Sequence, residues 1–311
     1  MINVEQDKKL ISSDFEKAFG ERLSQYVKNK IEEYDFIYSE IPDEERDHWL
    51  RRLVDVLLDP NLVYSGKHRI DQWEEGWGEN LNELITEKKI EKINPHYFSK
   101  YPVLRFMQKY IKPISVNFER NSLYVIQNWL FDKYVREAEN IYEFGCGTGH
   151  NLFLARDVNP KVKIWGLDWT TSSQKIIKKL VEEGIDKNMD AYNFDFFEPD
   201  YGFKLGNKSV VYTVASLEQI GDQYMKFVEY LLENKPELCI HIEPIGELLD
   251  ENNLLDYLSI KYFKKRKYLD GFLTKLRELE KEGKIEILKQ QRTYIGSLFI
   301  DGYSVVVWRV L

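Results

Sequence analysis

Apolar residues are spaced differently in the two halves of the chain. From about residue 12 to 138 they recur every three or four positions, as at Phe15 and Phe19, which places them on one face of a helix. Proline and glycine interrupt this pattern at points that suit helix ends, and the pair Gly76 and Gly78 is one such break. The first half is therefore predicted to be mostly helical.

The second half alternates short apolar runs with helical stretches, which is typical of β-α-β units and a parallel sheet. The predicted strands are 140–144, 163–168, 191–195, 209–215, 238–243, 285–294 and 303–310. The segment between the last two runs is too short for a crossover helix, so these runs are expected to pair as an antiparallel hairpin. We therefore predict an α/β fold with a helical domain over 1–120 and a domain over 121–311 whose sheet ends in a hairpin.

Composition and charge exclude several classes of protein. With 44 Lys and Arg against 52 Asp and Glu the net charge is −8, so the chain has no overall positive field to attract nucleic acid. No apolar run approaches the roughly 20 residues that cross a bilayer, and the first residues lack the apolar region of a signal peptide. Cys146 and Cys239 are the two cysteines, too few to crosslink this chain, so we expect a cytoplasmic location and no membrane partner.

A glycine-rich loop follows the first predicted strand and reads Glu143-Phe-Gly145-Cys-Gly147-Thr-Gly149. Glycine at every second position allows a tight turn and lets a ligand lie against the backbone. Dinucleotide enzymes favour G-x-G-x-x-G, whereas E-x-G-x-G-x-G resembles motif I of the class I S-adenosylmethionine-dependent methyltransferases. The resemblance covers roughly residues 120–311 and implies a Rossmann-like seven-stranded sheet, with Glu143 and the glycines at a site for S-adenosyl-L-methionine. A purely structural turn is the alternative.

Acidic residues after the second and third predicted strands strengthen this resemblance. Asp168 lies 19 residues after the last glycine of the loop, where the family's acid binds both ribose hydroxyls of the cofactor. Asp195 and Phe196 match the family's next segment, in which an Asp accepts a hydrogen bond from the adenine amino group and its neighbour holds the ring. Trp169 and Ser216 are assigned to the same cofactor site. Dehydrogenases also place an acid at the position of Asp168, and a helix cap or a surface turn explains either Asp without a ligand.

In open α/β sheets ligands bind beyond the carboxyl ends of the strands, so groups that act on a methyl acceptor are expected there. Glu218 follows the fourth strand, and alternation along the fifth puts His241 and Glu243 on one face. His150 follows the glycine loop at a helix start, where the dipole favours a neutral imidazole. We predict that catalysis draws on these four residues, one of which serves as a base for an alcohol acceptor, worth roughly 10² to 10⁴ in rate. Capping or solvation of the acids and a core position for His241 are the alternatives.

Other residues are predicted to bind the acceptor. Trp73 and Trp77 lie beside glycines and acids, and such rings form a platform for a sugar or a peptide, although core packing explains them equally well. Arg120 is expected to reach the carboxylate of the cofactor, and Gln219 to contact the acceptor. Five of the seven residues 261–267 are Lys or Arg, which suits either a phosphate-bearing acceptor or a solvated helix face.

These features predict a biosynthetic S-adenosylmethionine-dependent methyltransferase that acts on an oxygen or nitrogen of a small molecule, sugar or peptide. The helical domain is expected to cover the cleft and to help select the acceptor. Nucleic acid is disfavoured by the acidic net charge and by the lack of an Asn/Asp-Pro-Pro-Tyr motif after the fourth strand. No metal is expected, and a homodimer is compatible with the sequence. Two alternatives remain: a nicotinamide-dependent oxidoreductase, and a non-catalytic partner subunit that binds S-adenosylmethionine.

Overall fold

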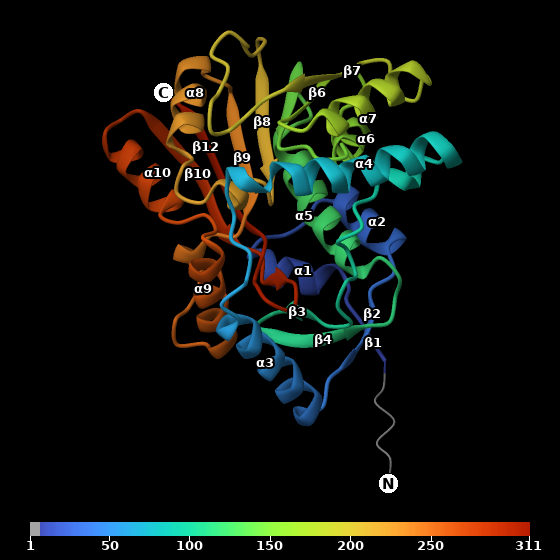
Figure 1. Cartoon of the computed structure of the whole chain (residues 1–311), viewed down its shortest axis with the longest axis vertical. Helices are drawn as coiled ribbons and strands as arrows, with labels where there is room; N and C mark the ends of the chain where they lie inside the picture. The colour runs from blue at the N-terminus through green and yellow to red at the C-terminus, as the bar shows by residue number, and fades with distance from the viewer. Residues whose placement is uncertain (1–6) are drawn as a thin grey trace.

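The computed structural model describes residues 7–311 and contains two β-sheets (Figure 1). The larger sheet has the strand order β10-β12-β9-β8-β5-β6-β7. Its strands are β5 (Asn140–Phe144), β6 (Lys163–Asp168), β7 (Met189–Asn193), β8 (Ser209–Val214), β9 (Leu238–Glu243), β10 (Ile285–Arg292) and β12 (Ser304–Val310). Strands β5 to β9 run parallel, and β12 pairs antiparallel with both β9 and β10. The predicted Rossmann-like seven-stranded sheet and its terminal hairpin are therefore confirmed.

The third parallel strand, β7, lies two residues earlier than the sequence pattern indicated. Its last residue, Asn193, pairs with Asp168 of β6. The backbone then leaves the sheet, because the Asp195 carboxylate accepts a hydrogen bond from the N–H of Phe197 at 2.8 Å. An Asp side chain that bonds the backbone two residues later forms a turn, so the predicted strand 191–195 is corrected to Met189–Asn193.

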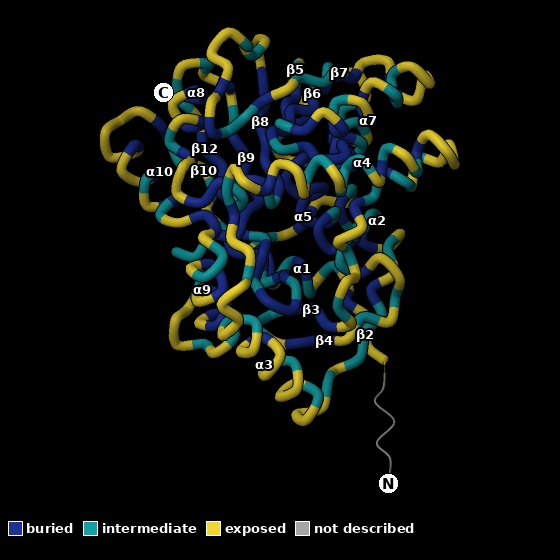
Figure 2. The backbone as a smooth tube through the Cα atoms, in the orientation of Figure 1, coloured by how far each residue is buried: buried dark blue, intermediate teal, exposed yellow. Residues whose placement is uncertain are grey.

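Helices cover both faces of the large sheet and give three layers. One face packs on α5 (Phe118–Tyr134), α6 (Leu152–Val158) and α7 (Thr171–Glu182), and the other on α8 (Met225–Asn234) and α10 (Phe272–Lys281). Residues alternate along each strand, so β5 sends Ile141 to the first face and Tyr142 to the second. Strands β8 and β9 are buried along nearly their whole length (Figure 2), as expected for a parallel sheet that is covered on both faces.

The second sheet was not predicted from the sequence. Its strands, in the order β1-β2-β4-β3-β11, are β1 (Lys8–Lys9), β2 (Ile37–Glu40), β4 (Lys109–Pro113), β3 (Leu104–Phe106) and β11 (Ile295–Gly296). The predicted helices are present as α1 (Ser12–Phe19), α2 (Gln25–Glu33), α3 (Asp43–Leu58) and α4 (Ile70–Glu87). The first half is therefore mostly helical, as predicted, but the prediction lacked this antiparallel sheet. Strands of two to five residues are too short to show clear alternation.

The hairpin that ends the large sheet also completes the small one. Strand β11 lies between β10 and β12 in sequence, and its Ile295 pairs with Phe106 of β3. Helix α9 (Leu254–Arg266) packs on α3, with Leu258 and Leu53 in one apolar cluster. The predicted domain boundary at residue 120 falls inside α5. The residues before and after this boundary also share the small sheet and one apolar cluster.

Helix α4 crosses the molecule between the two sheets (Figure 1). Gly76 and Gly78 lie inside this helix and not at a break, as the sequence had suggested. A Cβ on Gly78 would lie 3.5 Å from the hydroxyl of Ser172, so this glycine lets α4 approach the start of α7 closely. Each interior glycine destabilises a helix by roughly 1 kcal/mol, and contacts with α7 offset this loss.

Short 3-10 helices complete the chain: η1 (Lys67–Arg69), η2 (Ile90–Ile93), η3 (Leu217–Ile220) and η4 (Gly246–Leu248). Two of them, η1 and η3, lie next to the site described below. Within residues 7–311 no helix combines the length and apolar character needed to span a membrane.

Candidate active site

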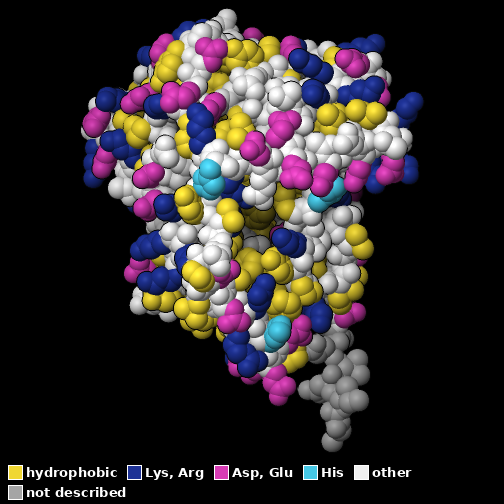
Figure 3. Space-filling view, in the orientation of Figure 1, with side chains coloured by type: hydrophobic (Ala, Val, Ile, Leu, Met, Phe, Trp, Pro, Cys, Tyr) yellow, Lys and Arg dark blue, Asp and Glu magenta, His cyan; other side chains and the backbone are white. Residues whose placement is uncertain are grey.

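Two adjoining cavities lie where the parallel strands end, with α4 along one side. The first, the loop cleft, borders Gly145 of the glycine loop and Asp168 at the end of β6. The second, the aromatic cavity, has a volume of about 480 Å³ and borders the same loop together with α9 and the residues after β11. Figure 3 shows a hollow near the centre of this face of the molecule. The carboxyl ends of parallel strands are where open α/β sheets bind ligands.

The glycine loop turns sharply because three of its residues have left-handed backbone. The angle φ is +74° at Gly145, +54° at Gly147 and +76° at Gly149, a region that residues with a Cβ adopt only with strain. The N–H of Gly145 donates to the carbonyl of Leu167 at 2.7 Å, which anchors the loop to β6. The sequence pattern thus corresponds to a conformation that only glycine adopts freely at all three positions.

Two neighbouring segments press against this loop. A Cβ on Gly145 would lie 2.4 Å from the Cβ of Ser216, and a Cβ on Gly147 would lie 3.0 Å from the Trp77 ring. The Ser216 hydroxyl donates to the Phe144 carbonyl at 3.0 Å, which holds the turn after β8 beside the loop. Ser216, predicted at the cofactor site, therefore lines the loop cleft, and α4 covers the middle of the loop.

Glu143 lies beneath the loop and is fully buried. Its carboxylate accepts hydrogen bonds from the Asn151 amide at 2.7 Å and the Tyr212 hydroxyl at 3.0 Å. Burial raises the pKa of Glu143 to about 8. Glu143 is absent from both cavity walls within the described chain, whereas Asn151 borders the aromatic cavity. Glu143 therefore orients a residue of the site.

Asp168 reaches the loop cleft from the end of β6, as predicted for the ribose-binding acid. Its carboxylate already accepts three hydrogen bonds, one from the N–H of Gly147 at 2.9 Å and two from the N–H and hydroxyl of Thr170 at 2.9 and 2.7 Å. Burial raises its pKa. A carboxylate offers about four acceptor positions, so about one remains open toward the cleft for a ligand hydroxyl. Asp168 can accept from a second ligand hydroxyl only if Thr170 turns away.

Aromatic residues form the other side of the loop cleft. Trp169 and Phe196, both assigned to the cofactor, border it. Asp195 does not border either cavity within the described residues. Its carboxylate is 3.2 Å from Nζ of Lys67 and accepts from the N–H of Phe197. The predicted acceptor of the adenine amino group is thus held at the edge of the cleft by a lysine that precedes α4.

Glu218 and Gln219 follow β8 in η3 and border the aromatic cavity. The Gln219 amide donates to Glu218 at 2.7 Å and accepts from the guanidinium of Arg69. Burial, with the neighbouring Glu243 as a second cause, raises the pKa of Glu218 to about 8. The chain therefore presents a carboxyl group on the cavity wall that exchanges a proton near neutral pH, as a general base requires.

Glu243, a further catalytic candidate, lies beneath η3. Its carboxylate accepts from the N–H groups of Ser216 and Leu217, both at 3.1 Å, and of Glu218 at 3.4 Å. Burial raises its pKa to about 7. Glu243 is not one of the described residues that line the two cavities. These hydrogen bonds cap η3, so Glu243 positions Glu218 and does not face an acceptor. This is the capping alternative that the sequence had left open.

His241 is also remote from the cavities. Its Nδ1 lies 2.9 Å from the Thr213 hydroxyl, and its ring centroid lies 5.1 Å from that of Phe272 and 6.2 Å from that of Trp308. Burial lowers its pKa to about 3, so the imidazole is neutral. The structure therefore gives His241 the core position considered as the alternative, and not contact with the site.

His150 does border the aromatic cavity. Its Nδ1 lies 3.2 Å from the Thr148 hydroxyl, while its Nε2 is buried without a hydrogen-bond partner in the described chain. Burial and then the charge of Arg120 lower the pKa of His150 to about 3. Arg120 itself lies over the Tyr124 ring at 5.5 Å and is not among the described residues of either cavity wall. The structure therefore brings His150 to the site without Arg120.

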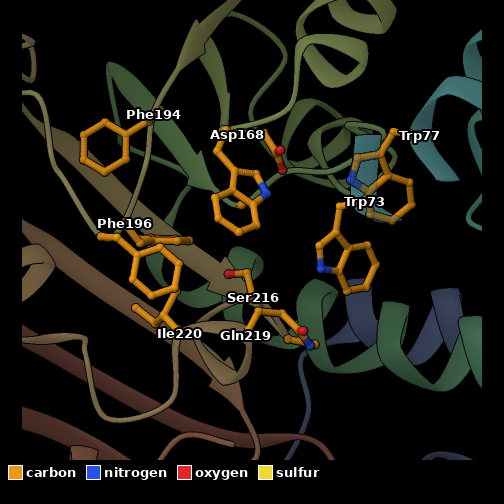
Figure 4. Close-up of a pocket in the computed structure, with 12 residues that line it drawn as sticks. Trp73, Trp77, Asp168, Phe194, Phe196, Ser216, Gln219 and Ile220 are labelled. Atoms are coloured by element: carbon orange, nitrogen blue, oxygen red, sulfur yellow. The ribbon is translucent and has the colours of Figure 1, made fainter. Parts of the chain in front are cut away.

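Trp73 and Trp77 project from α4 and border both cavities. Their ring centroids are 5.4 Å apart and their planes differ by 24°. Figure 4 shows them on the opposite side of the loop cleft from Phe196, with Asp168 and Ser216 between. The Nε1 of Trp73 is buried without a partner among the described residues. The pair was predicted to form an acceptor platform, and the Trp77 ring also lies against Gly147 of the glycine loop.

Sequence reasoning missed most of the aromatic cavity. The residues missed include Arg69, Tyr97, Tyr101, Tyr262, Tyr268, Phe299 and Tyr303, whereas Arg266 belongs to the basic run that was considered for a phosphate. One signal was present, because Tyr262 and Arg266 are four positions apart within the basic run and share a helix face. Lys264 and Lys267 of that run border a separate surface hollow. The remaining residues come from segments far apart in sequence, and no local pattern reveals that they meet.

The order of the seven strands, the antiparallel last pair and the glycine loop after the central strand define a class I methyltransferase fold. No protein-family model matches the chain. An uncharacterized protein of Dictyostelium discoideum, described as GPI-anchored, is 27% identical over 143 residues. The match covers 42% of this chain and 39% of that protein, so the chain spans less than half the length of this relative.

Solved structures with a similar fold include human N-acetylserotonin methyltransferase in complex with S-adenosylmethionine, at 14% identity and a TM-score of 0.48, covering 84% of this chain and 66% of that chain. The O-methyltransferase NcsB1 from neocarzinostatin biosynthesis matches at 14% identity and a TM-score of 0.42, covering 78% and 70%. The methyltransferase domain of bacterial CtHen1-C matches at 16% identity and a TM-score of 0.45, covering 63% of this chain and 99% of that chain. These likenesses concern the fold, and at such identities they do not indicate an acceptor.

Proposed function

We propose that this chain is an S-adenosylmethionine-dependent methyltransferase that acts on an oxygen or nitrogen of a small molecule. The observation that carries the proposal is the convergence of three groups on two joined cavities: the left-handed glycine loop, Asp168 and Glu218. The first two suit a nucleoside cofactor, and the third suits removal of a proton from an acceptor. The cavity volume of about 480 Å³ favours a small molecule over a folded protein or nucleic acid.

The residues of the loop cleft fit the proposed cofactor. S-adenosylmethionine, when bound, supplies a methyl group on a sulfonium that is already activated. Asp168 has an acceptor position for a ribose hydroxyl, and Trp169 and Phe196 offer apolar rings on the same cleft. The unpartnered Nε1 of Trp73 is a buried donor at this cleft. An unpaired buried donor costs free energy, so a ligand with an acceptor atom there stabilises the site.

On the acceptor side Glu218 is the candidate base. Transfer to a hydroxyl oxygen or an amide nitrogen requires loss of a proton, and transfer to an N–H amine gives an ammonium that loses its proton afterwards. A positioned base contributes roughly 10² to 10⁴ in rate. Gln219 and Arg69 hold the Glu218 carboxyl in place from one side, and Glu243 holds its backbone from below. His150, being neutral, is suited to accept or donate a hydrogen bond next to the glycine loop.

Two other functions are less well supported. A nicotinamide-dependent oxidoreductase commonly uses G-x-G-x-x-G, whereas this loop has glycine at every second position, and the antiparallel strand β12 between β9 and β10 is the feature that methyltransferase sheets add. A non-catalytic binding subunit needs no proton acceptor, yet Glu218 lies on the wall of the adjoining cavity. Both observations favour the methyltransferase.

Calorimetric titration with S-adenosylmethionine, S-adenosylhomocysteine and NADH tests the proposal. We expect the first two to bind and Asp168→Ala to weaken them about 10- to 100-fold, because a charged hydrogen-bond acceptor is lost. Asp190→Ala is the matched control, since Asp190 lies on the neighbouring strand β7 and is about half exposed. Binding of NADH alone would refute the methyltransferase and support the oxidoreductase.

A further inference from the structure

Two guanidinium groups meet at the wall of the aromatic cavity. Arg69 ends η1 before α4, and Arg266 ends α9, yet both border this cavity. Arg69 is only 8% exposed. Burial and then the neighbouring charge of Arg266 lower the pKa of Arg69. Two like charges therefore influence each other at one cavity wall, with Arg69 buried and Arg266 half-buried, which is unfavourable unless an anion joins them.

Neither guanidinium has a carboxylate partner among residues 7–311. Arg69 donates to the neutral side chains of Gln72 and Gln219. Arg266 lies over the rings of Tyr262 and Tyr268, at 5.9 and 5.2 Å. Its Nε is buried without an acceptor in the described chain. The hydrogen-bonding capacity of Arg266 is thus left for something that enters the cavity.

This arrangement differs from that of a structural arginine in the same protein. Arg292 is also buried, and it forms salt bridges with both Asp256 and Asp301. Buried charges are ordinarily paired in this way. Arg105, another buried arginine, has no carboxylate partner but donates four hydrogen bonds to oxygens of Leu255, Ser259, Leu298 and Phe299. Arg266 has neither arrangement among the described residues and borders a cavity, which points to a ligand.

The acids that face the cavity form no salt bridge with either guanidinium among the described residues. Glu218 interacts electrostatically with both arginines, but its hydrogen bond is with the Gln219 amide, and burial raises its pKa to about 8. Glu119 accepts from the N–H of Ser99 at 2.7 Å, and burial raises its pKa too. Lys100 adds a further cation on the wall. The described cavity wall therefore carries three Lys or Arg side chains against two Glu.

Several aromatic rings also line this cavity. The rings of Tyr262 and Phe299 are stacked, with centroids 5.2 Å apart and planes 6° apart, and Tyr101 meets Phe299 edge to face at 5.1 Å. Flat walls of this kind favour a flat apolar ligand, because aromatic rings prefer stacked or edge-to-face contact. The volume of about 480 Å³ is in the range of small-molecule sites.

We propose that the methyl acceptor is a small aromatic compound that carries an anionic group, carboxylate or phosphate, and that Arg266 and Arg69 bind this group. The inference rests on the proposed function and makes its acceptor more specific. A guanidinium offers paired N–H groups that match either anion. The acceptor hydroxyl or amine then lies toward Glu218, on the same cavity wall.

Calorimetry on protein saturated with S-adenosylhomocysteine tests this inference. The probes are 4-hydroxybenzoate and 6-hydroxy-2-naphthoate, their uncharged carboxamides, and 4-hydroxyphenyl phosphate. We expect an anion to bind at least about tenfold more tightly than its carboxamide. Arg266→Gln should weaken anion binding about 10- to 100-fold with little effect on the carboxamide, and Arg266→Lys should give an intermediate loss. The tighter of the carboxylate and the phosphate identifies the anion.

The control variant is Lys267→Gln. Lys267 is the next residue, but its Nζ lies over the Tyr64 ring at 4.2 Å and borders the other hollow, so this variant should bind all probes as the unchanged protein does. Arg69→Gln provides an independent variant if Arg266→Gln does not fold.

The inference is overturned if anion and carboxamide bind equally, if no anionic probe binds, or if both arginine variants keep the preference for the anion. Binding of S-adenosylhomocysteine is measured first in the same protein, so failure there refutes the proposed function and is distinct from a missing preference for anions.

Discussion

The carboxylate of Glu74 accepts two hydrogen bonds from Ser172, one from its backbone N–H at 3.0 Å and one from its hydroxyl at 2.6 Å. The other carboxylate oxygen accepts from the N–H of Thr171 at 2.6 Å. Glu74 lies on α4 and Ser172 in the first turn of α7, so a side chain of one helix caps the other. The first N–H groups of a helix lack partners within it and the dipole favours an anion there. This contact fastens α4 across the glycine loop.

Replacing Glu74 by Ala should loosen α4. We expect the free energy of unfolding to fall by about 1 to 2 kcal/mol, the usual cost of losing a cap, and amide hydrogens over residues 70–87 to exchange faster. Hydrogen exchange followed by mass spectrometry measures the second effect. Glu75→Ala changes the exposed neighbour on the same helix and serves as control. Equal protection of α4 in both variants would contradict the fastening role.

The activity should depend on pH through Glu218. Its pKa is raised to about 8, and only the deprotonated carboxylate accepts a proton, so kcat/KM should rise about tenfold per pH unit up to about pH 8 and then level off. Glu218→Gln should lower kcat by roughly 10² to 10⁴ and abolish this dependence. The measurement uses the phenolic acceptor that binds best in the calorimetric series. Glu119→Gln, which alters another acid of the same cavity, should keep the profile, and a flat profile in the unchanged protein would exclude Glu218 as the base.

Stability should fall as pH rises, because buried carboxyl groups hold protons in the folded state. The pKa of Glu143 is about 8 in the fold against an ordinary value of 4.5, so its contribution is fully present below about pH 4.5 and is lost as pH rises through about 8. Glu143→Gln removes this titrating group. The decrease in unfolding free energy with rising pH should then be smaller by roughly 1 to 3 kcal/mol. Urea denaturation at several pH values measures this. An unchanged slope would show that Glu143 is ionised in the folded protein.

Gly145→Ala should disrupt the loop more than its backbone angle alone explains. Gly145 and Gly184 both have φ of +74°, but a Cβ on Gly145 would lie 2.4 Å from the Ser216 Cβ, whereas the nearest atom at Gly184 is the end of the Lys187 side chain at 3.6 Å. Both variants share the cost of a left-handed alanine, about 1 to 2 kcal/mol. We expect only Gly145→Ala to lose S-adenosylhomocysteine binding and to unfold at a clearly lower urea concentration. Similar losses in the two variants would mean that the contact with Ser216 does not matter.

Local patterns in the sequence were sufficient for the large sheet. Four of the five parallel strands are mainly apolar runs, and runs of this kind are buried between the two helix layers. The exception is β7, which carries Asp190 and Asn193 and was predicted two residues too late. The glycine loop was equally clear from the sequence, because glycine is the residue that freely adopts the left-handed backbone found at Gly145, Gly147 and Gly149. The carboxylate of Asp168 reached the cleft as expected, since the end of a strand next to the central one has a defined place in this topology.

Only the tertiary structure decided what the polar residues do. Glu218 and Glu243 looked alike in sequence, but one borders a cavity and the other caps η3, because the direction of a side chain at a strand end depends on the turn packed above it. The small sheet and the joining of Ile295 to Phe106 were invisible because short strands carry little pattern. Arg69 and Arg266 border the same cavity although nearly two hundred residues separate them. Such encounters depend on how whole elements pack, and no local spacing encodes them.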